Sequence, residues 1–511
     1  MSCYAYSEYV KFNGESFFTI VCLPQKVGKF PVIICRSPYV GSSRSKTDEE
    51  AVEEYLNAQK LWLLHGYAII FQHCRGTGKS TGSFVPYIYE REDGLELRKW
   101  IRNQPFYNGE LYLLGASYTA SLHYATAPFE NDVKGAIFEV QDSNRYRLWY
   151  RNGQMRKGHA NWHFGLFNDG FNCPKNFNIK SFSELPLEGL SKRALGSSLE
   201  DFEQMLKAEN PNDDFWYTRN GGIETKNAVI DSNIPILLTT GYNDFYVGGV
   251  FDMWKNLNKE NKQNCAMLVS PYNHGDGFFD NGVAFNNGKR TEEFGNDYGI
   301  KWFDHIRKGT KLPFLKGVIT YYRAFSNCWQ SDFDTPKTEY VSLVLGDGEK
   351  EFVYDPKFPP AFKGEGEKAE SQIYGAITVY TRPFEEDAFI KGKMKVKLAV
   401  SSSAPDTSFY VRISLDKGEY SYVLRHDITS LIYALGSYKE NQIVELYFNF
   451  DEYAFLIKKG ERIRLDISST DDNVYVPHTN KKGKYYLQTK SQKATNRIYL
   501  DNSFLILPIE I

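Results

Sequence analysis

The sequence predicts an α/β fold with a parallel sheet, followed by a C-terminal unit built of β-strands. The first 140 residues alternate continuous apolar runs with stretches of helical spacing, a pattern typical of strands buried on both faces of a sheet. The apolar runs stop at about residue 141 and resume at 234. After about residue 315 helical spacing disappears, and short β-rich runs follow one another to the end.

The strand candidates of the first part are PVIICRS (31–37), YAIIFQHC (67–74), LYLLG (111–115) and VKGAIFEV (133–140). Between them, two stretches of helical spacing end at Gly66 and at Pro105, residue types that commonly end helices. A third helix is expected directly after Ser117. This alternation predicts βαβ units with crossover helices.

The middle stretch, 141–233, is rich in aromatic residues and then helical with breaks, so we interpret it as an insertion between strands. Strands resume at IPILLTTG (234–241) and NCAMLVS (264–270), and helical spacing returns at 299–312. From VITYYRAF to SFLILPIE, short strands separated by turn residues predict a β-sandwich or jelly roll. We therefore expect three units: a core formed by 1–140 and 234–315, a helical insertion at 141–233, and a sandwich at 316–511.

The composition argues against several classes of function. The chain has 61 Lys and Arg against 63 Asp and Glu, so no nucleic-acid-binding surface is indicated. Its seven cysteines form no CxxC pair, HGDGFFDNG (274–282) lacks the ligand pattern of a calcium loop, and 75–82 lacks P-loop spacing. Neither a signal-peptide pattern nor an apolar run of membrane length is found. We expect a cytoplasmic protein with no metal or other cofactor and no membrane partner.

The segment NGELYLLGASYTASLHYATAP (108–128) places Ser117 between a strand candidate and a helix candidate. A serine nucleophile needs an exposed oxygen, which requires a sharp turn with small neighbours. Gly115, Ala116 and Ala120 meet that need, whereas Thr119 stands where the commonest version, G-x-S-x-G, has its second glycine. An ordinary strand–helix connection would look similar, so the assignment depends on an acid and a base elsewhere.

Such an acid and base follow in the chain order Ser, Asp, His. Asp244 comes just after the strand candidate 234–241, and His274 just after 264–270. Loops at the carboxyl edge of a parallel sheet would bring both towards the serine. His73 is a rival base, but it precedes the serine and is the weaker candidate. We predict a catalytic triad of Ser117, His274 and Asp244.

GASYTA, GYNDFYVGG and SPYNHG, the segments that carry these three residues, resemble the cocaine esterase and X-prolyl dipeptidyl peptidase family of α/β-hydrolases. Further segments resemble the same family in the same order along nearly the whole chain: CRSPY, RGTGKSTG, FVPYIYEREDG, WIRNQPFYNG, SSSAPDTSFYVRIS and GERIRLDISST. The resemblance implies an α/β-hydrolase core, a helical cap within it and a C-terminal jelly roll. Two departures stand out: Ala120 replaces a usual glycine, and His73 replaces a usual aspartate.

The family's site residues, carried over by position, imply further roles. The oxyanion hole would pair the Tyr39 hydroxyl with the backbone N–H of Tyr118. Cap aromatic residues at the positions of Trp149 and Trp162 would bind substrate, together with Phe245 beside the acid. Together, the proposed triad and the family resemblance predict a serine hydrolase that cleaves small acyl esters through an acyl-enzyme on Ser117.

Two alternatives remain at this point. An X-prolyl dipeptidyl peptidase or amino-acid ester hydrolase would act on short peptides or amino-acid esters, and a carboxylate cluster including Asp142 or Glu224 would favour it. A more remote alternative is a non-catalytic module that binds sugars or proteins. The sequence leaves open the natural substrate and the oligomeric state, a homo-oligomer included.

Overall fold

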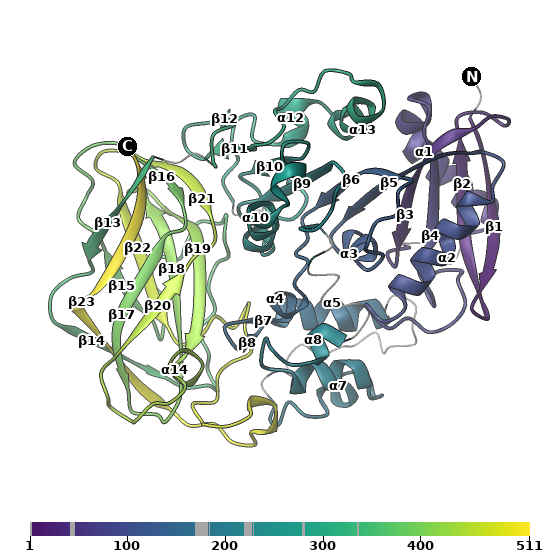
Figure 1. Ribbon diagram of the computed structural model, residues 1–511. Helices are drawn as coiled ribbons and strands as arrows, with labels where there is room; N and C mark the ends of the chain where they lie inside the picture. Colours follow the sequence, from purple (N-terminus) through teal and green to yellow (C-terminus); the bar gives the residue numbers. More distant parts are fainter. Residues whose placement is uncertain are drawn as a thin grey trace.

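The computed structural model describes residues 3–40, 46–168, 182, 184–218, 227, 229–277, 282–334 and 337–511. Its central feature is a ten-stranded mixed sheet with the strand order β1-β2-β4-β3-β5-β6-β9-β10-β11-β12 (Figure 1). Its strands are β1 (Tyr4–Phe12), β2 (Glu15–Leu23), β3 (Phe30–Ser37), β4 (Ala68–His73), β5 (Tyr107–Ala116), β6 (Val133–Glu139), β9 (Ile236–Gly241), β10 (Ala266–Ser270), β11 (Ile319–Arg323) and β12 (Cys328–Gln330). Neighbours from β4 through β11 pair in parallel, and antiparallel strands stand at both edges.

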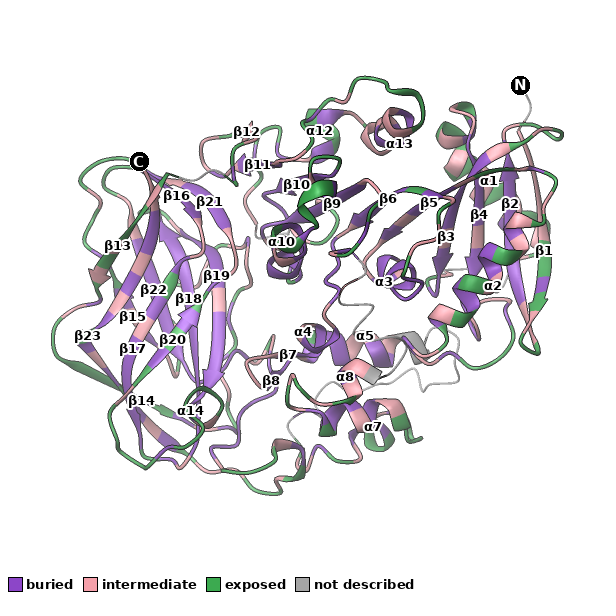
Figure 2. Ribbon diagram, viewed as in Figure 1, coloured by how far each residue is buried: buried purple, intermediate pink, exposed green. Residues whose placement is uncertain are grey.

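Helices cover both faces of this sheet, which explains why its strands are continuously apolar. Ile33 of β3 packs with Trp302 and Phe303 on one face, whereas Val32 and Ile34 pack with residues of the opposite face. The first face is covered by α1 (Asp48–Leu64) and α13 (Tyr298–Lys308), and the second by α2 (Glu90–Arg102), α3 (Tyr118–Tyr124) and α10 (Val247–Asn256). Shorter helices α11 (Lys259–Lys262) and α12 (Arg290–Phe294) lie in the connections. The strands are buried throughout the middle of the sheet (Figure 2).

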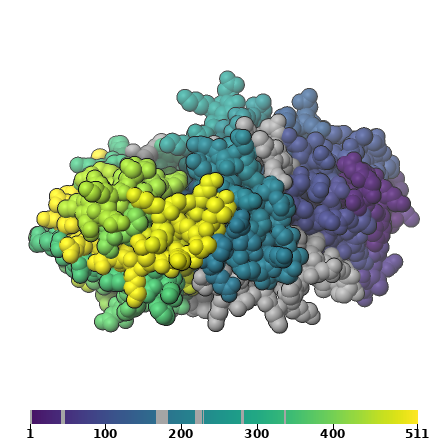
Figure 3. Space-filling model, turned by 90° about the horizontal axis from the view of Figure 1, so that it is seen from below, coloured from purple at the N-terminus to yellow at the C-terminus, as the bar shows by residue number. Residues whose placement is uncertain are grey.

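The chain leaves the sheet after β6 and returns to it at β9, and the described residues between them add no strand to the sheet. They form α4 (Arg145–Trp149), the small hairpin β7 (Tyr150–Arg151) and β8 (Gln154–Met155), α5 (Lys157–Asn168), α6 (Leu190–Leu195), α7 (Glu200–Lys207) and α8 (Phe215–Thr218). Figure 3 shows this helical segment, in teal, between the yellow C-terminal residues and the purple-blue N-terminal part. We call it the cap.

The C-terminal part is a two-layer β-sandwich with a short helix, α14 (Leu431–Leu435), and a 3₁₀ turn at Tyr485–Leu487. One layer has the order β20-β17-β23-β16-β21, with β13 and β14 also paired to β23, and the other has the order β15-β22-β18-β19. Its strands are β13 (Thr338–Val344), β14 (Glu349–Tyr354), β15 (Ile377–Tyr380), β16 (Ala388–Gly392), β17 (Lys395–Ser402), β18 (Ser408–Asp416), β19 (Ser421–Ser430), β20 (Val444–Asn449), β21 (Tyr453–Ile457), β22 (Arg462–Ser468) and β23 (Ala494–Glu510).

Two features differ from the sequence prediction. The segment VITYYRAF was expected among the sandwich strands, but β11 pairs in parallel with β10 of the central sheet, with Met267 opposite Ile319. A single apolar run does not reveal which sheet it joins, because strands of both units share this composition. The hairpin of β1 and β2 was not predicted, although Asn13 (φ 50°) and Gly14 (φ 79°) form the two-residue turn typical of hairpins. We retain the three-unit division of the chain as a proposal.

Candidate active site

Ser117 lies at a strained turn between β5 and α3, with φ 55° and ψ −135°. Its backbone N–H donates to the carbonyl oxygen of Glu139 at 2.9 Å. A Cβ at Gly115 would come within 2.6 Å of the Thr119 backbone, so this position requires glycine. The Thr119 hydroxyl accepts from the N–H of Ala116 at 2.7 Å and donates to its carbonyl oxygen at 2.6 Å. Thr119, which stands in place of the second glycine of G-x-S-x-G, therefore holds the turn closed through these two hydrogen bonds.

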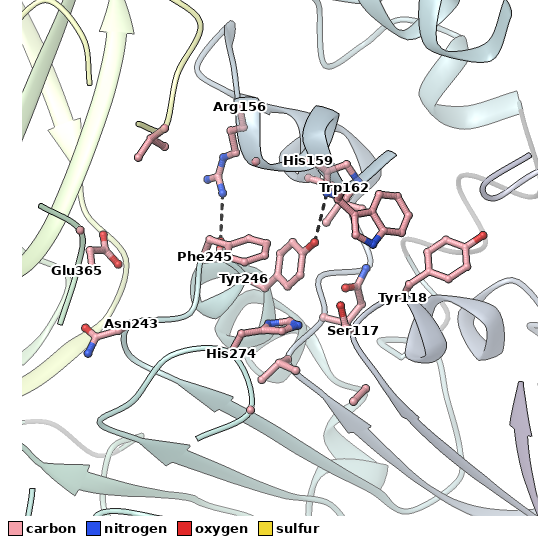
Figure 4. Close-up of a pocket in the computed structure, with 18 of the residues that line it drawn as sticks. Ser117, Tyr118, Arg156, His159, Trp162, Asn243, Phe245, Tyr246, His274 and Glu365 are labelled. Atoms are coloured by element: carbon pink, nitrogen blue, oxygen red, sulfur yellow. Dashed lines mark hydrogen bonds between the residues drawn. The ribbon is translucent and has the colours of Figure 1, made fainter. Parts of the chain in front are cut away.

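Asp244 and His274 follow the carboxyl ends of the neighbouring strands β9 and β10. The Asp244 carboxylate is fully buried, and its Oδ2 lies 2.8 Å from Nδ1 of His274. Its other oxygen accepts from the backbone N–H of Tyr246 at 2.8 Å. Because Nδ1 is engaged by the carboxylate, Nε2 is the imidazole nitrogen available to the cavity. Figure 4 shows the ring of His274 extending towards Ser117.

Tyr39 follows β3, and its hydroxyl contacts both the cap and the serine. The indole N–H of Trp162 donates to this hydroxyl at 2.8 Å, and the Ser117 side chain is also hydrogen-bonded to it. Burial raises the pKa of Tyr39 to about 12, so the phenol keeps its proton at neutral pH. An indole N–H can only donate, so the phenol accepts from it and keeps its own proton for another acceptor.

Tyr118 is the first residue of α3, where backbone N–H groups have no acceptor within the helix. Its side chain points away from the serine into a buried network: the hydroxyl donates to Glu90 at 2.7 Å and accepts from the N–H of Tyr87 at 2.8 Å. Burial, with the nearby Glu90 carboxylate, raises the pKa of Tyr118 well above its usual value. The phenol thus anchors the start of α3 while the backbone N–H stays at the turn.

These groups meet in a cavity of about 690 Å³ whose wall is built by the central sheet, the cap and the sandwich. The residues that line it come from all three parts of the chain: Tyr39, Tyr87, Ala116, Ser117, Tyr118, Val140, Gln141, Leu148, Arg156, Gly158, His159, Trp162, Asn243, Phe245, Tyr246, His274, Gly275, Gly364, Glu365, His426, Asn473 and Val474. The lining is mainly apolar with a few polar groups, as is usual for small-molecule sites.

The structure brings most of the predicted site residues to this cavity. Ser117, Tyr39, Tyr118, Trp162, Phe245 and His274 all line it, and Asp244 lies behind His274. The Phe245 ring stacks on the His274 ring with 5.4 Å between centroids.

Trp149, predicted to bind substrate, lies instead in the hydrophobic core of the cap. It is 4% exposed and packs against His159, His163 and Phe202. Its neighbour Leu148 lines the cavity in its place. On a short helix a shift of one residue turns a side chain from the cavity to the core, and sequence position alone cannot fix that rotation.

The other candidates from the sequence lie elsewhere. His73 is buried under β2, where its Nδ1 accepts from the N–H of Lys79 at 3.3 Å, and burial with the Lys79 charge lowers its pKa to about 4. It does not line the cavity. Asp142 forms a buried ion pair with Arg147 at 2.7 Å. Glu224 lies outside the described residues.

Several cavity residues were not predicted, and most come from parts of the chain far from the elbow serine. Arg156 and His159 belong to the cap, whereas Glu365, His426 and Asn473 belong to the sandwich. Their sequence neighbourhoods carry no catalytic motif. Only contacts between distant segments bring them here, so a single sequence offers no local signal for them.

The described residues contain no group of three or more His, Cys, Asp or Glu side chains arranged to hold a metal ion. Among their helices, none has both the length and the apolar character needed to span a membrane.

The fold and the elbow serine define the class of protein: it is a serine hydrolase with an α/β-hydrolase core and a C-terminal jelly-roll sandwich. More particularly, the chain belongs to the X-Pro dipeptidyl-peptidase (S15) family, whose family model matches residues 14–276. The model of the X-Pro dipeptidyl-peptidase C-terminal non-catalytic domain matches residues 315–504.

Similar proteins span nearly the whole chain. The cocaine esterase of Rhodococcus sp. (strain MB1 Bresler) is 22% identical, with 95% of each chain covered. Among solved structures, an α-amino acid ester hydrolase is 18% identical with a TM-score of 0.82, covering 99% of this chain and 97% of that one. An aminopeptidase from a marine-sediment Thaumarchaeota archaeon is 16% identical with a TM-score of 0.81, covering 100% and 97%.

Proposed function

We propose that this hydrolase cleaves carboxylic esters of small molecules through an acyl-enzyme on Ser117. The observation that carries the proposal is the meeting of four groups at one cavity. The Asp244 carboxylate lies 2.8 Å from Nδ1 of His274, and His274 and Ser117 line the same cavity. The Tyr39 hydroxyl is hydrogen-bonded to the Ser117 side chain. This set contains an orienting acid, a base, a nucleophile and a donor for developing negative charge.

In the first step, the Ser117 hydroxyl turns from Tyr39 towards His274, and Nε2 takes its proton while Oγ attacks the ester carbonyl carbon. The carbonyl oxygen becomes an oxyanion that accepts from the Tyr39 O–H and from the Tyr118 backbone N–H. When the tetrahedral intermediate collapses, the bond to the alcohol oxygen breaks and His274 gives that oxygen its proton. Water then repeats the sequence on the acyl-enzyme and restores the serine hydroxyl.

The charges around the cavity favour esters over substrates that carry an ammonium group. Of the described residues that line the cavity, Glu365 is the one acid. Its carboxylate is already paired with Arg425 at 2.8 Å and with His426 at 3.1 Å, and these neighbours hold the pKa of Glu365 below its usual value. A carboxylate neutralised in this way attracts an ammonium weakly. Esters are also easier to cleave, because an alkoxide leaves more readily than an amine.

The runner-up is hydrolysis of Xaa-Pro peptides or amino-acid esters, and the family and the named structural neighbours support it as a class. Of the two acids that would have favoured it, Asp142 is bound to Arg147 and does not line the cavity, and Glu224 lies outside the described residues. Membership of a hydrolase family argues against the non-catalytic binding module considered from the sequence.

The test compares p-nitrophenyl butyrate with an Xaa-Pro p-nitroanilide in the purified protein and in Ser117→Ala. The exposed loop residue Ser83, outside the cavity, provides the matched control Ser83→Ala. We expect ester turnover that Ser117→Ala abolishes and Ser83→Ala preserves, with slow or no amide turnover. Ester hydrolysis that survives in Ser117→Ala would remove Ser117 as the nucleophile, and faster amide than ester turnover would favour the peptidase.

A further inference from the structure

The cavity continues past His274 to a second region where the cap meets the sandwich. Arg156 lies between β8 and α5, and Glu365, His426 and Asn473 line the facing wall. In Figure 4 Arg156 points down into the cavity beside Phe245, on the opposite side of His274 from Trp162. This region therefore lies within the same cavity as Ser117 but away from the oxyanion donors.

Arg156 brings a positive charge to this region, and the described residues leave that charge without an ion pair. One terminal N–H donates at the long distance of 3.4 Å to the carbonyl oxygen of Phe245, and Nε is buried with no hydrogen-bond partner among the described residues. A guanidinium normally directs its five donors to a carboxylate or phosphate. Arg156 therefore keeps guanidinium N–H groups, Nε–H among them, that could donate to a bound ligand.

Two acids near Arg156, Glu365 and Asp451, already pair with other arginines. Glu365 is paired with Arg425 and His426, and Asp451 is paired with Arg151 at 3.2 Å. The charges of Arg151, Arg425, Lys393 and Arg156 together lower the pKa of Asp451, but Arg156 forms no ion pair of its own among the described residues. Arg156 is therefore the guanidinium of this lining that has no acid partner among the described residues, because the Glu365 carboxylate already pairs with Arg425.

The order of residues along the cavity indicates which part of a substrate reaches Arg156. Trp162 and Tyr39 stand on the oxyanion side of Ser117, whereas the Phe245 ring stacks on His274 and its backbone carbonyl meets Arg156. His274, as the general acid, must reach the oxygen of the leaving alcohol. The leaving group consequently extends from His274 past Phe245 towards Arg156.

We propose that Arg156 binds a carboxylate on the leaving group, so that the enzyme prefers esters whose alcohol portion is itself a hydroxy acid. The inference rests on the proposed ester hydrolysis and adds the substrate class. The guanidinium holds the carboxylate through charge-assisted hydrogen bonds while the chemistry at Ser117 proceeds as described. The products are the free acyl acid and the anionic hydroxy acid.

The experiment uses two esters that differ at one group, 3-acetoxybenzoate and 3-acetoxybenzamide. Their leaving phenols are alike in size, but only the first carries a carboxylate. The readout is the ratio of kcat/KM for the carboxylate over the carboxamide, because a general loss of activity in a variant cancels in this ratio. The proteins compared are wild type, Arg156→Gln and Arg307→Gln. Arg307 lies on α13 outside the cavity, so its change removes the same charge elsewhere.

We expect a ratio of roughly ten in wild type and in Arg307→Gln, as one charge-assisted contact in a partly solvated site provides. In Arg156→Gln the ratio should fall to about one, since glutamine keeps polar contacts but loses the charge. An equal ratio in wild type and Arg156→Gln would overturn the inference. If both proteins still hydrolyse p-nitrophenyl butyrate through Ser117, the proposed function would stand while the carboxylate preference falls.

A binding measurement covers the case in which neither acetyl ester is turned over. Calorimetry on Ser117→Ala would compare 3-hydroxybenzoate with 3-hydroxybenzamide, with and without the Arg156→Gln change. Tighter binding of the carboxylate by roughly tenfold, lost in Arg156→Gln and weakened by added salt, supports the inference. Equal binding of the two compounds overturns it, whatever the catalytic result.

Discussion

Replacing Tyr39 by phenylalanine is the sharpest test of the oxyanion hole. The change removes one O–H and keeps the ring, so the cavity wall retains its shape. The residue is 42% exposed, yet burial of its hydroxyl is sufficient to raise the pKa to about 12. A donor to the oxyanion is worth about 2.7–4 kcal/mol. Because this donor lies in a partly solvated cavity, we take the lower end, which corresponds to a fall in kcat of about a hundredfold.

The assay is steady-state hydrolysis of p-nitrophenyl butyrate by Tyr39→Phe. We expect the loss to appear in kcat with KM nearly unchanged, because the oxyanion forms only in the transition state. Tyr380→Phe is the matched control, since Tyr380 is 40% exposed and lies on β15 of the sandwich outside the cavity. Tyr380→Phe should leave kcat and KM unchanged. A fall in kcat of less than threefold in Tyr39→Phe would refute the assignment of its hydroxyl to the oxyanion hole.

Three further changes test the parts that support this site. Trp162→Phe removes the N–H that donates to the Tyr39 hydroxyl at 2.8 Å but keeps an aromatic ring, so kcat should fall several-fold. Unchanged kinetics would mean that the indole does not position the Tyr39 hydroxyl. Asp244→Asn should lower kcat by about 10⁴-fold without unfolding the protein, because the amide favours the wrong imidazole tautomer, and activity near wild type would exclude this acid. Asp93→Asn removes a buried carboxylate that pairs with the buried Arg36 and the partly buried Arg75, and it should cost about 3 kcal/mol of the free energy of unfolding. The melting midpoint followed by circular dichroism should then drop by several degrees, and an unaltered midpoint would contradict a stabilising role for Asp93.

The sequence is most informative where one local rule determines the structure. Strands β3 to β6 contain continuous apolar runs because helices cover both of their faces. The structure confirms β3, β4 and β6 to within one residue at each end, whereas β5 begins four residues before the predicted run. The Asn13-Gly14 turn carried an equally local signal that the prediction did not use. By contrast, the composition of VITYYRAF, which contains β11, does not indicate which sheet the strand joins. Its pairing with β10 places it in the central sheet.

The candidate site divides in the same way. Ser117, Asp244 and His274 follow strand ends, so their convergence was predictable from strand order, and their roles stay a prediction. The rotation of Trp149 into the cap core was not predictable, because it depends on how a short helix packs. The wall formed by Glu365 and its neighbours depends on docking of the sandwich against the core, some 250 residues after the serine. Such contacts leave no trace in local composition.

The cavity wall is built by separate parts of the chain, and this has a consequence for how the substrate range of the enzyme can change. The candidate reactive groups follow the carboxyl ends of strands of one sheet. Part of the cavity wall belongs instead to the sandwich, as His426 of β19 and the loop residues Gly364, Glu365, Asn473 and Val474. Loops tolerate exchange far better than strands do, since little of the buried core depends on them. New substrate ranges can therefore be sought by grafting sandwich loops, with the turn that carries the nucleophile left untouched.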